Sequence, residues 1–82
     1  MSFAKLYETE VGQILVKLDE GDNGAQINIY FQPENLGVCS IDFNWRDDIE
    51  KVQWEKADKA FEMMTEKACL EMVQNTLNEF TV

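Results

Sequence analysis

The sequence offers few side chains that could do chemistry, and histidine is absent from all 82 residues. Histidine is the usual general base at neutral pH and the commonest metal ligand. Without it, this chain alone cannot build a Ser-His-Asp triad, a Cys-His pair or a histidine-ligated metal site. The remaining candidates are two cysteines and carboxylate pairs such as Glu8 with Glu10 and Asp47 with Asp48.

Neither the carboxylates nor the cysteines carry a signature of catalysis. Acid-base work by a carboxylate pair requires environments that shift their pKa values apart, and exposed carboxylates are expected in a chain with 16 acidic residues. Cys39 and Cys69 match no C-x-x-C pattern and have no evident activating partner. We therefore expect no catalytic residue and no cofactor, and both cysteines to be reduced.

The acidic run DEGDNG is the segment most similar to a metal-binding loop. Asp19, Asn23 and Gly24 match the first, fifth and sixth positions of an EF-hand loop. The third position is Gly21, and the twelfth is Tyr30 where a bidentate Glu is required. The flanking residues alternate as strands do, so we expect a hairpin turn and no metal site.

Three segments, residues 13–19, 26–32 and 38–45, alternate with the period of a strand. The turn-forming residues between the first two predict an antiparallel hairpin, and Pro33 should end the second strand. The apolar faces are Ile14, Val16 and Leu18; Ile27, Ile29 and Phe31; and Cys39, Ile41, Phe43 and Trp45. One face of the sheet should therefore be covered and the other should face water.

The N-terminal residues 3–11 allow two interpretations. Leu6, Tyr7 and Val11 fit a first strand joined through Gly12, and they also fit a short helix capped by Ser2. We favour a strand or an extended arm.

Residues 49–80 predict helix, because neither Gly nor Pro interrupts them. We expect the preceding Arg46-Asp47-Asp48 to cap its start. The segment carries two apolar stripes: Trp54, Ala57, Phe61, Met64, Ala68 and Met72, and then Cys69, Val73, Leu77 and Phe80. A straight helix cannot press both on one sheet, so either it breaks near residues 65–68 or the second stripe faces the N-terminal arm or another subunit.

These patterns predict a single α+β domain over residues 1–82, with strands in about 1–45 and helix in about 47–80. The sheet should be small and antiparallel, with three or four strands. One long helix, or two joined by a tight bend, should pack on its apolar face.

The net charge of −9 argues against direct contact with nucleic acid or anionic lipid, both of which require clustered Lys and Arg. No apolar run approaches the length of a membrane span. The cysteine content and the absence of a signal-peptide pattern lead us to expect a cytoplasmic protein.

The composition favours a non-enzymatic adaptor, regulator or inhibitor that binds another protein, and two surfaces are candidates. One is the polar sheet face, where Tyr30 is flanked by Asn28, Asp42 and Asn44. The other is the stripe of Val73, Leu77 and Phe80, which would support a homodimer if it were exposed. The alternatives are an ordinary solvated sheet face and a stripe covered by Phe3 or Leu6.

A second hypothesis is a DNA mimic that blocks the basic groove of a nucleic-acid-binding protein. The composition is similar to that of small acidic accessory proteins of phages and mobile elements. Against this hypothesis, Lys51, Lys56, Lys59 and Lys67 interrupt the acidic residues of the predicted helix.

Overall fold

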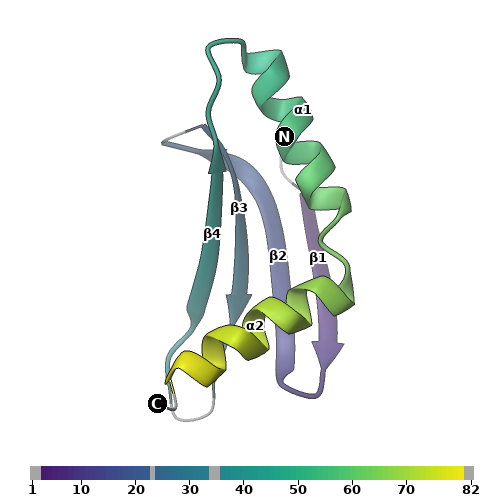
Figure 1. Cartoon of the computed structure of the whole chain (residues 1–82), viewed down its shortest axis with the longest axis vertical. Helices are drawn as coiled ribbons and strands as arrows, with labels where there is room; N and C mark the ends of the chain where they lie inside the picture. Colours follow the sequence, from purple (N-terminus) through teal and green to yellow (C-terminus); the bar gives the residue numbers. More distant parts are fainter. Residues whose placement is uncertain (1–2, 23, 34–35, 81–82) are drawn as a thin grey trace.

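The computed structural model describes residues 3–22, 24–33 and 36–80, which form an antiparallel sheet followed by two helices (Figure 1). The strands are β1 (Phe3–Thr9), β2 (Gly12–Gly21), β3 (Gly24–Phe31) and β4 (Cys39–Trp45), and they lie in the order β1-β2-β3-β4. The helices are α1 (Glu50–Glu62) and α2 (Glu66–Phe80). The predicted α+β class is confirmed, and residues 3–9 form a strand; Ser2, the alternative helix cap, lies outside the described residues.

The register of the strands places the predicted apolar residues on one face. Val16 lies opposite Ile29, and Ile29 lies opposite Ile41, with every neighbouring pair antiparallel. The buried core consists of Ile14, Val16, Leu18, Ala25, Ile27, Ile29, Phe31, Ala57, Cys69 and Val73. Burial of each large aliphatic side chain contributes about 1.5–3 kcal/mol, so β2 and β3 supply most of the apolar stabilisation.

The connection from β4 to α1 differs from the predicted cap. The N-cap residue of α1 is Ile49, which makes no side-chain capping bond. Asp47 lies two residues earlier: its Oδ1 accepts the N–H of Ile49 at 3.0 Å and its Oδ2 pairs with Lys56 at 3.2 Å. The N–H of Ile49 holds the pKa of Asp47 below its usual value, with help from Lys56. The prediction that residues 46–48 cap the helix directly was wrong, because Asp47 is bound in a turn before the helix.

The helical segment is interrupted at residues 63–65, slightly before the break that the sequence left open near residues 65–68. Met63 is the C-cap of α1. The Thr65 hydroxyl then accepts the N–H of Ala68 at 3.2 Å, which satisfies one of the free donors at the start of α2. The threonine therefore fixes where the second helix starts.

The two helices pack on the same face of the sheet and diverge from this bend. Figure 1 shows α1 passing from the upper end of β4 towards β1, and α2 crossing back in front of the lower half of the sheet. Two side chains of β1 hold the bend: Lys5 Nζ donates to Phe61 O at 2.6 Å and the Tyr7 hydroxyl donates to Met64 O at 2.8 Å. Burial raises the pKa of Tyr7, which further disfavours ionisation of the phenol that donates this bond.

The bend resolves the conflict between the two apolar stripes. Ala57 of the first stripe and both Cys69 and Val73 of the second are buried in one core. Met72 and Leu77 are partly buried and pack against that core. A change of helix direction thus lets stripes on different faces reach the same sheet.

The two cysteines should differ strongly in reactivity. Both are free, but Cys69 is fully buried while Cys39 is partly exposed. Burial also raises the pKa of the Cys69 thiol, which lowers its thiolate fraction at mildly alkaline pH. We expect a thiol reagent at about pH 8 to modify Cys39 at least tenfold faster than Cys69. Mass spectrometry of the time course measures both rates; denaturant should equalise them, and equal rates in the native protein would contradict the burial of Cys69.

Candidate functional site

The sheet face opposite the helices carries a row of apolar side chains across neighbouring strands. The register places Leu6 opposite Leu15 and Leu15 opposite Tyr30. Residues that precede β4 extend this row beyond the sheet. Together they line an open hollow, here called the outer groove: Leu6, Gln13, Leu15, Lys17, Tyr30, Phe31, Gln32, Pro33, Leu36 and Val38.

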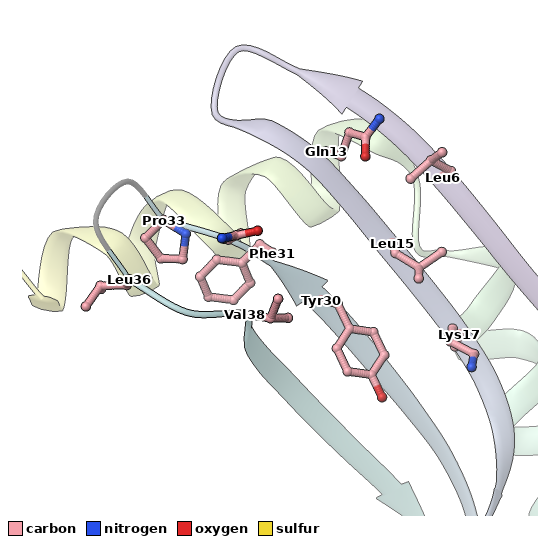
Figure 2. A pocket seen from close by; sticks show the side chains of 10 residues that line it. Leu6, Gln13, Leu15, Lys17, Tyr30, Phe31, Pro33, Leu36 and Val38 are labelled. Atoms are coloured by element: carbon pink, nitrogen blue, oxygen red, sulfur yellow. The ribbon is translucent and has the colours of Figure 1, made fainter.

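The outer groove is wide and has an apolar surface. Its volume is about 920 Å³. Three of its aliphatic side chains are largely open to solvent: Leu6 is 57% exposed, Leu36 50% and Val38 67%. Figure 2 shows Tyr30 between Val38 on one side and Leu15 and Lys17 on the other. Exposed aliphatic side chains that share one groove with an aromatic side chain are characteristic of interaction surfaces.

The polar residues predicted beside Tyr30 form a hydrogen-bonded patch next to the outer groove. The Asn28 amide donates to Asp42 and accepts a bond from Gln26 at 3.0 Å. The Ser40 hydroxyl also donates to Asp42, at 3.2 Å. Asn44 lies opposite Gln26 on this face and is exposed. The structure therefore brings Asn28, Asp42 and Asn44 together, and places Tyr30 in the adjoining groove.

The second predicted surface, the stripe of Val73, Leu77 and Phe80 on α2, does not form an open patch among the side chains that the structure describes. Val73 is 1% exposed, and Leu77 packs against the core, so neither contributes to an open apolar patch. Phe80 is the last residue of α2, and its side chain lies outside the described part of the chain. Of the two residues considered as a cover for this stripe, Leu6 lines the groove on the opposite face and Phe3 lies beside Phe61 of α1, with ring centres 6.2 Å apart.

Sequence reasoning missed most of the outer groove, although two signals were present. Leu15 is the one apolar residue between Gln13 and Lys17 on the polar face of its strand. Val38 has the same strand parity as Ser40 and Asp42, which placed it on the polar face as well. Apolar residues on an otherwise solvated face deserve a functional interpretation when the register brings them together.

The acidic candidates are engaged in local structure. Glu8 accepts a bond from Gln13 at 3.4 Å and Glu10 accepts one from Gln74 at 3.3 Å. In the run DEGDNG, the Asp19 carboxylate accepts the N–H of Glu20 at 2.8 Å; Asn23 lies outside the described residues. Within residues 3–22, 24–33 and 36–80, no three or more acidic or cysteine side chains are grouped as a metal site requires. These residues thus shape turns and surface.

Comparison of the chain with known protein families, with curated proteins and with solved structures gives no match. Neither described helix is both long enough and apolar enough to cross a membrane. The fold and the groove together define a small acidic α+β protein with helices on one face of its sheet and an apolar groove on the other.

Proposed function

We propose that this protein is a non-enzymatic, cytoplasmic binding module that docks a segment of another protein in the outer groove. The observation that carries the proposal is that three exposed aliphatic side chains, Leu6, Leu36 and Val38, line the same groove as Tyr30. Covering these side chains removes apolar surface from water, which is the main favourable term in protein association. Because the bound segment would no longer be free for other contacts, binding in the outer groove would regulate or inhibit the partner.

The form of the groove suits a protein segment better than a small molecule. Small-molecule sites usually enclose 70–90% of the ligand surface, whereas this hollow is open along the sheet face (Figure 2). The amides of Gln13 and Gln32 lie exposed on its lining and can pair with the backbone of a bound segment. Aliphatic side chains of the partner would contact Leu15, Tyr30 and Val38.

Charge further defines the partner. The net charge of −9 favours a partner with basic residues. On the outer face, the strand positions of Glu8, Asp19 and Asp42 place carboxylates around the groove, and Lys17 lies on its lining. We therefore propose a segment with one or two large apolar side chains flanked by Lys or Arg.

Two matched variants test this proposal. Val38→Asp places a charge in the outer groove, and Met63→Asp places the same charge at a 74% exposed methionine in the bend between the helices. We expect Val38→Asp to weaken binding of the partner at least tenfold and Met63→Asp to leave the affinity unchanged. Partners captured from lysate with the unaltered protein are compared for both variants, and isothermal titration then gives the affinities. A partner held equally by both variants would contradict groove binding.

Salt concentration separates this proposal from charge mimicry. Burial of apolar surface persists at high salt, whereas binding that relies on many exposed ion pairs is screened. The DNA-mimic hypothesis would be favoured by two results together: both variants bind the partner equally at low salt, and the partner is lost at high salt.

A further inference from the structure

The two edges of the sheet are protected differently. β1 carries Lys5, whose side chain points to the helix side, where Nζ donates to Phe61 O and lies 4.3 Å from the centre of the Phe61 ring. A charged residue turned inwards on an edge strand disfavours the addition of another strand. β4, with the sequence CSIDFNW, has neither lysine nor proline. Figure 1 shows it at the left edge of the sheet.

The apolar side chains of β4 are incompletely covered. Ile41, Phe43 and Trp45 are partly exposed, while their neighbours on β3 are fully buried. Phe43 and Trp45 lie with ring centres 6.2 Å apart along this strand. The uncovered side of this row lies where a fifth strand would pack, since β3 covers the other side.

We propose that β4 pairs antiparallel with β4 of a second copy of this chain, in a register centred on Phe43. The strand has a single ionisable carboxylate, Asp42, so two copies of an acidic protein meet there with little local repulsion. The symmetric pair would join two four-stranded sheets into one, with the helices of both copies on the same face.

The side chains favour this register over centring on Asp42 and over a shift by one residue. Centring on Phe43 places Ile41 against Trp45 of the second copy and Asp42 against Asn44 of the second copy. Apolar residues then meet on the helix side, and a carboxylate meets an amide donor on the outer side. Centring on Asp42 would oppose two identical carboxylates. A shift by one residue would bring the polar face of one copy onto the apolar face of the other.

Position 44 provides a test with opposite expected outcomes. Asn44 is exposed, so substitution there should not disturb the core. Asn44→Asp opposes Asp42 across the interface twice, and we expect it to weaken the dimer about tenfold. Asn44→Lys forms two cross-strand ion pairs, and we expect it to tighten the dimer by a similar factor. Sedimentation equilibrium from low micromolar to submillimolar protein measures each dissociation constant.

Substitutions on the opposite edge supply the control. Ala4 is exposed on β1, so Ala4→Asp and Ala4→Lys make the same size of charge change away from the proposed interface. They should alter the dissociation constant much less than the pair at Asn44. A protein that stays monomeric throughout the concentration range would overturn the inference. So would a dimer that responds equally at both positions, or one that is dissociated by Leu6→Asp, a groove substitution on β1, which would place self-association in the outer groove.

Discussion

Replacing Gly24 with alanine should destabilise the fold by about 3 kcal/mol or more. Gly24 starts β3 with φ of +103°, a conformation that residues with a Cβ rarely adopt. A Cβ there would also lie 2.5 Å from the backbone oxygen of Trp45 and 2.9 Å from Oε1 of Gln53. Both contacts join the hairpin to β4 and α1, so the added methyl group would strain three elements. Chemical denaturation monitored by tryptophan fluorescence measures the change.

Two other glycines separate the backbone effect from the clash. Gly12 has φ of +100° with nothing within 4 Å of an added Cβ, so Gly12→Ala should show the backbone penalty alone, about 1–2 kcal/mol. Gly37 also has open space, without a positive φ, so Gly37→Ala should be nearly neutral. If Gly24→Ala and Gly12→Ala lowered the free energy of unfolding equally, the close approach to Trp45 would be relieved without an energetic cost.

The sheet could be predicted from the sequence because its strands have one dry face. Apolar residues at every second position, such as Ile27, Ile29 and Phe31, predict a buried strand face, and these three residues are buried in the core. The rotated stripes of the helical region allowed either a break or a separate partner for the second stripe, and the structure has the break. Its position could not be predicted from the stripes, since a capping bond from Thr65 to the N–H of Ala68 decides where α2 begins.

The outer groove could not be predicted because it depends on contacts between distant segments. Leu6 joins Leu15 and Tyr30 only through the pairing of β1 with β2 and of β2 with β3. The sequence left residues 3–11 open between strand and helix, so Leu6 had no assigned face. Leu36 contributes from a connection outside the regular strands, where periodicity carries no information.

The burial of the second stripe has a direct consequence for stability. Val73→Asp should destabilise the protein by about 3–5 kcal/mol, because it places an unpaired charge in the core. Val73 is 1% exposed and belongs to the same cluster as Ile14 and Cys69. This loss is a large part of the total stability of a small domain, about 5–15 kcal/mol. We expect a much lower denaturation midpoint, or detachment of α2, visible by circular dichroism and by amide exchange along the helix.

Asn75→Asp is the matched control, since it adds the same charge to an exposed position of α2 two residues away. It should change stability by no more than about 0.5 kcal/mol. The comparison separates the two explanations of the stripe that begins at Cys69. A stripe that served an interface would let Val73→Asp fold normally while dissociating an oligomer. A stripe that belongs to the core makes the variant unfold at every protein concentration, because the lost contacts lie within one chain.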